Sequence, residues 1–439
     1  MSKIEKNNNG ILWAWASYDW ANSAYALVIS SAVFPLYYGA IFKMAGTQEV
    51  YFFGVTLKHT ALISFITALA FVCVALCSPL LSGIADYLGN KKRFMQFFCY
   101  LGASSCIGLG FFDMAHLHWG MLCFFFGLIG FWGSLVFYNA YLPDLATTDQ
   151  QDRWSARGYA LGYVGSVLLL LVNLAMVLQP QWFSITDTAT EPAALKAMRY
   201  SFISVGVWWI ICSQWAFWKL PNQRTGKTFH ADVVWKGYKE LKWVWKQMEH
   251  LSNLKKFLTG FFVYSMAVQT VMLMATYFGE QEIAWKDADE RTQGLIGSIL
   301  IIQLVAVFGA LLTSKASARF GNRNTLMGLN FCWLALCITA YSVYTPNQFY
   351  GVALCVGLVM GGIQSLSRST YAKLLPETQD TTSFFSFYDV AEKVGIVVGM
   401  SLYGLIDQWT GSMRLSIVFL AVFFATGILL LRRMRPLTT

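Results

Sequence analysis

Apolar stretches of about 20 residues recur along this chain, separated by short polar segments. A helix needs about 20 predominantly apolar residues to cross a bilayer, so each stretch predicts one membrane-spanning helix. The longest hydrophilic segment, residues 221–256, divides these spans into two sets of six. The pattern therefore predicts an all-α membrane protein with an N-terminal half (1–220), a cytoplasmic linker (221–256) and a C-terminal half (257–439). The twelve predicted spans are 12–42, 60–82, 94–112, 118–140, 158–179, 200–219, 257–278, 294–313, 325–345, 349–372, 385–406 and 415–433.

Two short motifs recur at nearly the same interval. Residues 88–91 (Leu-Gly-Asn-Lys) return 232 positions later as residues 320–323 (Phe-Gly-Asn-Arg). The motif Tyr-x-x-Tyr-Leu-Pro-Asp at 138–144 returns 233 positions later as Tyr-x-x-Leu-Leu-Pro-Glu at 371–377. A constant offset of about half the chain indicates one structural unit used twice. The two six-helix halves are therefore predicted to be pseudo-repeats.

Composition and charge agree with this reading. The chain is 56% hydrophobic and 13% charged, whereas soluble domains carry about 25% charged residues. With a cytoplasmic N-terminus, 23 of the 32 Lys and Arg residues fall in inner segments, 7 in outer segments and 2 within spans. This asymmetry satisfies the positive-inside rule and predicts that both termini are cytoplasmic. Membrane orientation thus explains the net charge of +9, and no nucleic-acid partner is expected.

The linker carries one amphipathic pattern. Val234, Tyr238, Leu241, Trp245 and Met248 follow at spacings of three and four, with lysines between them. This pattern predicts a helix that lies on the cytoplasmic membrane surface or against the bundle. We interpret it as an interdomain linker, and a calmodulin-type or regulatory role is the alternative.

The sequence gives no sign of catalytic or metal chemistry. All nine cysteines lie in apolar stretches, where we expect them to act as packing residues. The five histidines lie in loops or at span ends, and no Cys/His spacing suits zinc. A membrane-embedded enzyme would need a nucleophile, base or metal cluster at a membrane boundary. We therefore expect no enzyme activity, no metal and no cofactor.

Several polar and ionisable residues lie within the predicted spans, where they are costly and usually functional. Asp19, Asn22 and Tyr25 form a polar stripe on the first span. Asp389 and Lys393 are four residues apart and are predicted to pair. The charges have three possible roles: a cytoplasmic gate, a site for substrate or a coupling proton, or fixed structural pairs. Asp19 is the preferred proton carrier, because no basic residue lies within one helical turn of it. A partner from another helix, such as Arg368, would weaken that choice. The remaining candidates for substrate or proton coupling are Asn139, Tyr163, Gln364, Arg368 and Glu392.

The turn between the second and third spans is a candidate gating element. Gly89 permits a sharp turn, and Asp86 can pair with a base or cap a neighbouring helix. The basic residues Lys91, Lys92 and Arg93 anchor the turn, and Arg157 opens the fifth span nearby. In the second copy Ala318 replaces the acid, so the first copy is predicted to be the conformational latch.

These residues resemble a known family. Residues 82–93 resemble the loop signature of the major facilitator superfamily, with Ser82 in place of its usual first glycine. Residues 18–25 (Tyr-Asp-Trp-Ala-Asn-Ser-Ala-Tyr) resemble the first-span signature of its vacuolar effluxer branch. Further similar segments are 138–144, 158–165, 364–369 and 385–393.

The resemblance implies a secondary transporter of twelve helices that works by alternating access. Fungal members of the branch are associated with amino-acid efflux from the vacuole. Because this chain lacks long loop extensions, we expect a multi-pass protein of a prokaryotic cytoplasmic membrane. The sequence hypothesis is a monomeric carrier, proton-linked or facilitative, for a small polar solute such as an amino acid. The alternatives are a sugar or peptidoglycan-fragment carrier of the same fold, and a non-transporting receptor or scramblase.

Overall fold

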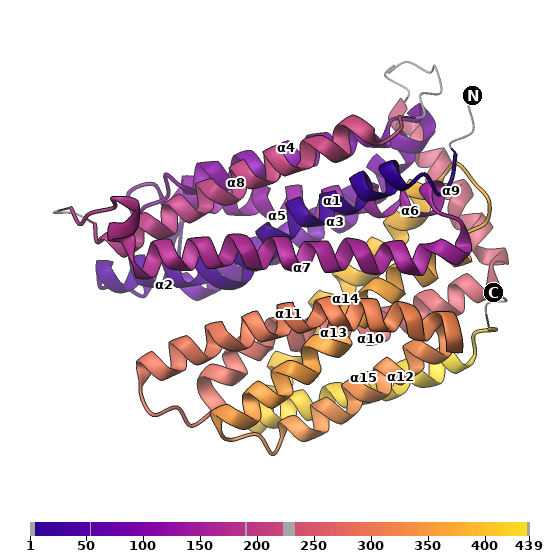
Figure 1. The fold of residues 1–439 in the computed structure, drawn as a ribbon. Helices are drawn as coiled ribbons and strands as arrows, with labels where there is room; N and C mark the ends of the chain where they lie inside the picture. The colour runs from indigo at the N-terminus through magenta and orange to yellow at the C-terminus, as the bar shows by residue number, and fades with distance from the viewer. Residues whose placement is uncertain (1–4, 53, 189–190, 223–232, 437–439) are drawn as a thin grey trace.

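The protein is a bundle of long helices, seen in a computed structural model that describes residues 5–52, 54–188, 191–222 and 233–436 (Figure 1). The first half contains α1 (Asn9–Ala24), η1 (Tyr25–Val33), α2 (Phe34–Ala45), α3 (His59–Leu88), α4 (Lys91–Leu109), α5 (Leu117–Asn139), α6 (Leu142–Leu145), α7 (Thr148–Leu178), η2 (Pro180–Phe183) and α8 (Ala193–Lys219). The second contains α10 (Ser252–Glu282), α11 (Ala288–Phe320), α12 (Asn322–Ala340), α13 (Pro346–Leu374), α14 (Thr381–Thr410) and α15 (Met413–Arg432).

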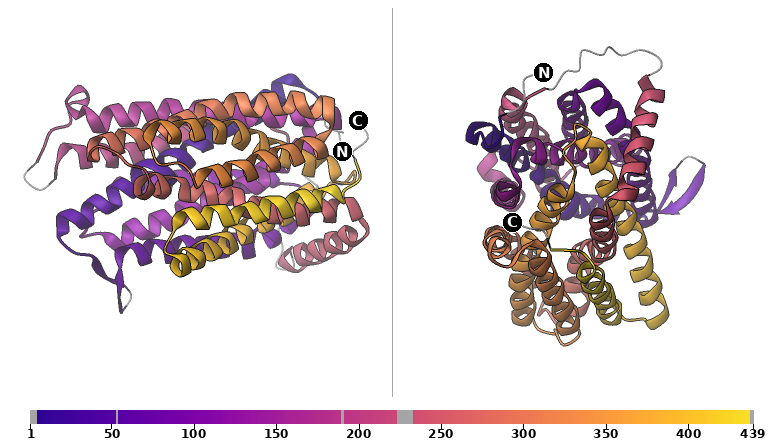
Figure 2. Two further views of the ribbon diagram at one scale, coloured as in Figure 1. Left: turned by 90° about the horizontal axis from the view of Figure 1, so that it is seen from below. Right: turned by 90° about the vertical axis from the view of Figure 1, so that its right-hand side faces the viewer.

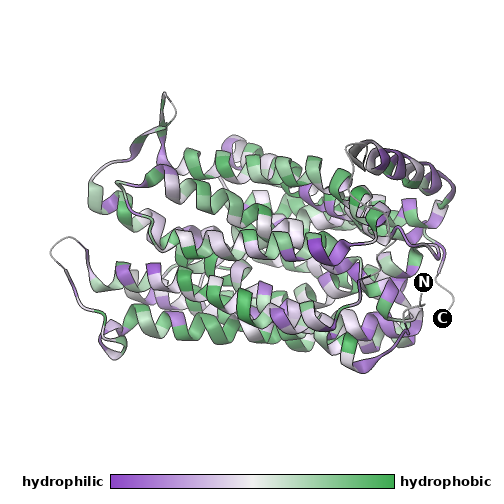
Figure 3. Cartoon of the chain, turned by 90° about the horizontal axis from the view of Figure 1, so that it is seen from above, coloured by the Kyte–Doolittle hydropathy of each residue, from purple (hydrophilic) through white to green (hydrophobic). Residues whose placement is uncertain are grey.

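Every predicted span overlaps one of these long helices. Nine helical segments in the described part of the chain are long and apolar enough to cross a membrane. Hydrophobic residues cover the middle of the helices, and hydrophilic residues collect toward the ends (Figure 3). The helices α4, α12 and α14 fall outside the nine because they carry more polar side chains, such as Asp389, Glu392 and Lys393 in α14. The count of twelve spans therefore stays a prediction.

The two sets of helices form two packed layers that face each other (Figure 1). In the first half, α1 packs against α7 and α8, and α4 packs against α5 and α8. In the second half, α11 packs against α13, and α15 packs against α10 and α12. The halves meet where α7 contacts α11 and α13, and where α3 contacts α14. Segments far apart in sequence thus form one junction along the length of the bundle.

The two ends of the bundle differ. At one end the side chain of Asn7 bonds with Thr147, and the backbone N–H of Arg435 donates to Asn253 Oδ1 at 2.8 Å. This end also holds α9 (Val233–His250), and we call it the α9 end. The opposite end carries an antiparallel hairpin of β1 (Glu49–Phe52) and β2 (Val55–Lys58), and we call it the hairpin end.

The first predicted span is not one regular helix. Between α1 and α2, the segment η1 (Tyr25–Val33) is a π-helix, in which each turn holds more residues than in an α-helix. Ser31 Oγ donates to the carbonyl oxygen of Ala26 at 2.9 Å, which matches the five-residue π repeat. The apolar pattern did not predict this change of pitch.

The predicted linker helix is present as α9, but it presents a different face to the bundle. It packs against α3, α10 and α14, and it buries Gly237, Val244 and Met248. Tyr238 and Trp245, expected on the apolar stripe, remain 46% and 54% exposed. Part of the stripe is thus turned away from the bundle, because the bare backbones of Gly83 and Gly237 meet and set the rotation of the helix. The side chain of Val234 and the linker residues Arg224, Lys227 and His230 lie outside the described residues.

Small residues also allow close packing of α11 on α13. A Cβ atom added at Gly361 would lie 2.1 Å from the carbonyl oxygen of Ala306, and one added at Gly309 would lie 2.1 Å from that of Leu358. Backbone atoms cannot yield as a flexible side chain can, so these helices depend on glycine for their separation.

We therefore predict that Gly361→Ala lowers the free energy of unfolding by about 1–3 kcal/mol, since overpacking forces the helices apart. Gly351→Ala on the same helix is the matched control, because a Cβ atom there meets no atom within 4 Å. It should be neutral or slightly stabilising, as alanine is the better helix former. Thermal unfolding of both variants in detergent measures the difference, and equal midpoints would contradict the prediction.

Candidate functional site

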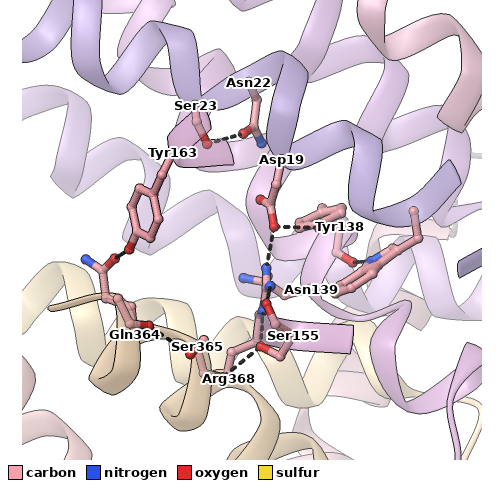
Figure 4. Close-up of polar contacts among 12 residues, drawn as sticks. Asp19, Asn22, Ser23, Tyr138, Asn139, Ser155, Tyr163, Gln364, Ser365 and Arg368 are labelled. Atoms are coloured by element: carbon pink, nitrogen blue, oxygen red, sulfur yellow. Dashed lines mark hydrogen bonds and ion pairs between the residues drawn. The ribbon is translucent and has the colours of Figure 1, made fainter. Parts of the chain in front are cut away.

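An ion pair buried at the junction of the two halves forms the centre of the site. Arg368 of α13 is 1% exposed and Asp19 of α1 is 5% exposed. The Nη1 atom of Arg368 lies 3.2 Å from Oδ2 of Asp19, and the Tyr138 hydroxyl donates to the same oxygen at 2.7 Å (Figure 4). The pair links the first helix of one half to the second half.

The rest of the guanidinium group is also occupied. Its Nε donates to Ser155 Oγ and its Nη2 to the Ser155 carbonyl oxygen, both at 2.9 Å. Its Nη1 donates to Asn139 Oδ1 at 3.3 Å (Figure 4). The rings of Tyr159, Trp15 and Tyr138 lie 4.2, 5.0 and 5.4 Å from the guanidinium carbon. Hydrogen bonds and cation–π contacts thus compensate a charge removed from water.

A bare helix face on α7 makes room for this pair. A Cβ atom at Gly158 would lie 2.6 Å from Asp19 Oδ2 and 3.0 Å from Arg368 Nη2. One turn later, a Cβ atom at Gly162 would lie 2.4 Å from Ser23 Oγ. These glycines therefore let α7 approach α1 closely enough for Ser155 to reach the guanidinium group.

The structure brings only part of the predicted polar stripe to this junction. The Tyr163 hydroxyl donates to Gln364 Oε1 at 2.7 Å across the two halves. Asn22 is buried, and its Oδ1 accepts from Ser23 at 3.4 Å while its Nδ2 has no partner among the described residues. Tyr25 points into the first half, where it stacks on Phe131 at 5.1 Å. Its expected place beside Asp19 is wrong, because aromatic packing turns it away.

A second charge cluster lies on α14. Lys393 Nζ is 2.6 Å from Asp389 Oδ1, so the predicted pair is present, and it is 2.9 Å from Glu392 Oε2. The first half approaches through Trp132, whose ring centroid is 3.8 Å from Lys393 Nζ, and through Ser78, which donates to Asp389. Two carboxylates share one ammonium group. Glu392 is the most exposed of the three, with 18% of its side chain accessible.

Glu392 has one further partner. Its Oε1 accepts a hydrogen bond from Gln269 Nε2 of α10 at 2.8 Å. The cluster therefore includes α10 as a second helix of the second half. The hydrogen bond holds the Glu392 carboxylate in place, while part of the side chain stays accessible.

The turn between α3 and α4 joins the halves at the α9 end. The carboxylate of Asp86 accepts from the backbone N–H groups of Ser383 at 2.6 Å and Thr382 at 3.3 Å. These groups belong to the first turn of α14, so an acid of one half caps a helix of the other. Gly89 has φ of +65°, as its turn requires. Lys91 bonds to the Asp144 carboxylate and, at 3.1 Å, to Thr381 Oγ1 across the junction.

Three predicted gating residues form no hydrogen bond or ion pair across the junction with any residue that the structure describes. Lys92 Nζ donates to the Leu220 carbonyl oxygen at 2.8 Å within its own half. Arg93 is exposed. Arg157 stacks on the rings of Trp13 and Trp154, at 5.2 and 4.6 Å, and forms no ion pair with another described residue. The inclusion of Arg157 in the gate is not supported by its position.

The second copy of the turn also joins the halves, contrary to expectation. Asp152 of α7 accepts from Lys373 Nζ at 2.6 Å, Ser317 Oγ at 2.8 Å and Asn322 Nδ2 at 2.9 Å. The second turn has Ala318 where the first has Asp86. The carboxylate comes instead from Asp152 of the facing half. Sequence reasoning missed Asp152 because the residue lies in a polar segment; the repeated asparagine, Asn322, was the available signal.

An apolar cavity of the second half lies apart from these charge clusters. Within the described ranges, no group of three or more His, Cys, Asp or Glu side chains could hold a metal ion. A cavity inside the second half is lined by apolar side chains such as Phe278, Trp333 and Phe349. The charges at the junction are therefore the site with the most evident chemistry.

Comparison with known proteins gives a consistent picture. Residues 7–435 match the family model described as vacuole effluxer Atg22 like. The chain is 31% identical to the uncharacterized MFS-type transporter YxiO of Bacillus subtilis, covering 98% of this chain and 95% of that protein. It is 26% identical to autophagy-related protein 22-2 of Aspergillus clavatus over 62% of this chain, and it spans 46% of that protein.

Solved structures show the same fold at low sequence identity. The transporter FucP in its outward conformation superposes with a TM-score of 0.70 at 13% identity, covering 97% of this chain and 99% of that one. The proton:xylose symporter XylE gives 0.68 at 12% identity, covering 97% and 95%.

We predict that Asp19→Asn destabilises the protein by about 3–5 kcal/mol, because it leaves the buried guanidinium without its counterion. The double variant Asp19→Asn/Arg368→Gln should lose less than the single one, since it removes both charges. Asp113→Asn is the control, because the pair of Asp113 with His116 is exposed and should change stability by less than about 1 kcal/mol. Thermal unfolding provides the comparison, and a double variant less stable than Asp19→Asn would refute the pairing.

Proposed function

Because the chain belongs to the family of Atg22-like vacuole effluxers, whose fold is that of the major facilitator transporters, we propose that it carries a small polar solute, such as an amino acid, across a membrane by alternating access. The observation that carries this proposal is the buried Asp19–Arg368 pair, which joins the two halves. A transporter needs such reversible contacts, since its halves must separate on one side at a time.

We further propose twelve spans with both termini in the cytoplasm, so that the α9 end is the cytoplasmic end. The excess of Lys and Arg in the segments of this end supports that orientation. The relative that matches over 98% of the chain is bacterial, which supports a prokaryotic cytoplasmic membrane. One chain contains both halves of the proposed route, so we expect it to act as a monomer.

The contacts at the α9 end support a cytoplasmic gate. Three interactions here join the first half to the second. Asp86 accepts a hydrogen bond from the first turn of α14, Lys91 donates one to Thr381, and Asp152 forms an ion pair with Lys373. These bonds must break before the halves can part at this end. The arrangement corresponds to a carrier closed on the cytoplasmic side.

The charges suit a zwitterionic solute. A substrate carboxylate can replace Asp19 on Arg368, because the guanidinium group binds carboxylates in a fork geometry. A substrate ammonium group can balance the extra carboxylate of the second cluster, where Glu392 is partly accessible. Asn139, Tyr163 and Gln364 add uncharged hydrogen-bonding groups at the same junction.

The same geometry suggests how a proton is coupled. Arg368 already neutralises Asp19, so a proton on Asp19 would release the guanidinium group for the substrate carboxylate. Proton uptake and substrate binding would then depend on each other. Glu392 is the second candidate, since it has two neighbours with hydrogen-bonding groups, Lys393 and Gln269, and stays partly exposed.

Two alternative functions, a lipid scramblase and a sugar carrier, can be distinguished from the proposed one. A scramblase exposes a polar groove to lipid, whereas the charges here are enclosed between the halves, which favours a carrier. FucP and XylE are described as a fucose:proton symporter and a proton:xylose symporter, so monosaccharides belong in the substrate panel.

We predict that the purified protein in liposomes accumulates at least one member of an amino-acid panel, and that an imposed pH gradient increases uptake. Asp19→Asn should abolish the effect of the gradient, because its side chain cannot exchange the proton. Asp113→Asn should behave like the wild type. Gradient-dependent uptake by Asp19→Asn would remove the proton role of Asp19, and uptake of sugars alone would replace the amino-acid assignment.

We also predict that Asp86→Asn and Asp152→Asn each open the α9 end. Each loses charge-assisted hydrogen bonds worth about 1.5–3 kcal/mol, which corresponds to roughly a tenfold or greater rise in the open population. The measurement is the rate at which a water-soluble maleimide labels Ser386→Cys, a buried position on α14, in a cysteine-free background. An effect of Asp86→Asn alone would restore the expectation of a single latch.

A further inference from the structure

We propose that α9 binds the headgroups of anionic phospholipids and thereby holds the α9 end closed. This inference rests on the proposed orientation, in which the α9 end faces the cytoplasmic leaflet. Lipid binding itself can be measured without any knowledge of the transported solute.

The first observation is a row of lysines that points away from the bundle. Lys239, Lys242 and Lys246 follow at spacings of three and four, so they share one face of the helix. The buried residues Gly237 and Val244 lie on the opposite face. All three lysines are exposed, and Lys242 and Lys246 form no ion pair with any residue of the described chain.

The second observation is the aromatic content of the same helix. Trp235, Tyr238, Trp243 and Trp245 are 60%, 46%, 46% and 54% exposed. Such side chains have an apolar ring and a polar group, and they collect where hydrocarbon meets water. An acidic protein or a nucleic acid would match the lysines alone, whereas a phospholipid surface matches both the lysines and the rings.

The third observation is the position of α9. Its Gly237 backbone contacts the backbone of Gly83, five residues before the end of α3 at Leu88. At 1.5 Å per residue this is about 8 Å from the end of a candidate membrane span, which is the depth of lipid headgroups. Figure 2 shows α9 at the edge of the bundle.

The fourth observation connects this surface to the gate. On one side α9 contacts α3, where Lys236 Nζ lies 5.5 Å from the ring centroid of Tyr87. On the other it contacts α14, where the rings of Trp245 and Phe387 lie 5.4 Å apart. Asp86 joins these same two helices through Ser383. The halves cannot part here unless α9 leaves one of them, so lipids that hold α9 in place favour the closed gate.

The test compares lipid retention by the full chain. The purified protein is exchanged into vesicles of phosphatidylcholine with either no phosphatidylglycerol or about one phosphatidylglycerol in three lipids, and retained lipid is measured by native mass spectrometry. One basic residue near a membrane surface is worth about 1 kcal/mol, or roughly a fivefold change. The triple variant Lys239→Gln/Lys242→Gln/Lys246→Gln should therefore retain many-fold less phosphatidylglycerol than the wild type.

A variant with an equal loss of charge at the same end is the matched control. Lys315→Gln/Arg319→Gln/Arg433→Gln removes three exposed charges outside α9 and should retain the lipid like the wild type. Equal losses in both variants would overturn the proposal, because they would show attraction to net charge alone. Inorganic phosphate or an acidic protein that displaces the lipid signal in the wild type would overturn it in favour of that ligand.

The link to the gate has its own readout. Phosphatidylglycerol should slow maleimide labelling of Ser386→Cys severalfold, and the triple variant should lose this effect while the control variant keeps it. An unchanged rate despite retained lipid would overturn the closing role of α9. Failure of solute uptake would leave both lipid measurements intact, so the two hypotheses fail separately.

Discussion

A buried charge that must be neutralised from another helix is the constraint on which the rest of this structure depends. Arg368 is almost fully enclosed, and its charge is tolerable only while Asp19, Ser155 and Asn139 surround it. Those partners belong to the opposite half of the chain. The pair thus adds an electrostatic and directional contact to the packing of α7 on α11 and α13.

The contacts at the α9 end show how two copies of one sequence motif keep a similar interaction while exchanging residues. One turn carries its acid, Asp86, and points it at the backbone of the facing helix. The other turn carries Ser317 and Asn322 and receives the acid, Asp152, from the facing helix. In both copies a carboxylate accepts hydrogen bonds at the seam. The symmetry is thus one of interactions, and it is hidden when only aligned residue types are compared.

Features set by spacing along one helix could be predicted from the sequence, whereas features set by contacts between helices could not. The positions of the long helices and the pairing of Asp389 with Lys393 follow from spacing along one helix, which the sequence records directly. The partner of Asp19 lies 349 positions away. The sequence offers Arg368 as one possible partner, but only the docking of the two halves decides the pairing. The orientation of Tyr25 and the buried face of α9 depend on competing contacts with Phe131 and Gly83. These features are set by packing between helices, and the periodicity of one helix does not encode them.

The π-helical segment η1 has a consequence for how this protein tolerates change in length. In an α-helix, deletion of one residue rotates everything beyond it by about 100° and would turn a buried face toward lipid. A π-helical turn already holds surplus residues, and Ser30 and Ser31 within η1 are exposed. Loss of one of them can be absorbed by tightening to α-helical pitch. A change of length within η1 therefore need not rotate α1, which carries Asp19, relative to α2. The sequences of α1 and α2 can then change independently while each helix keeps its contacts.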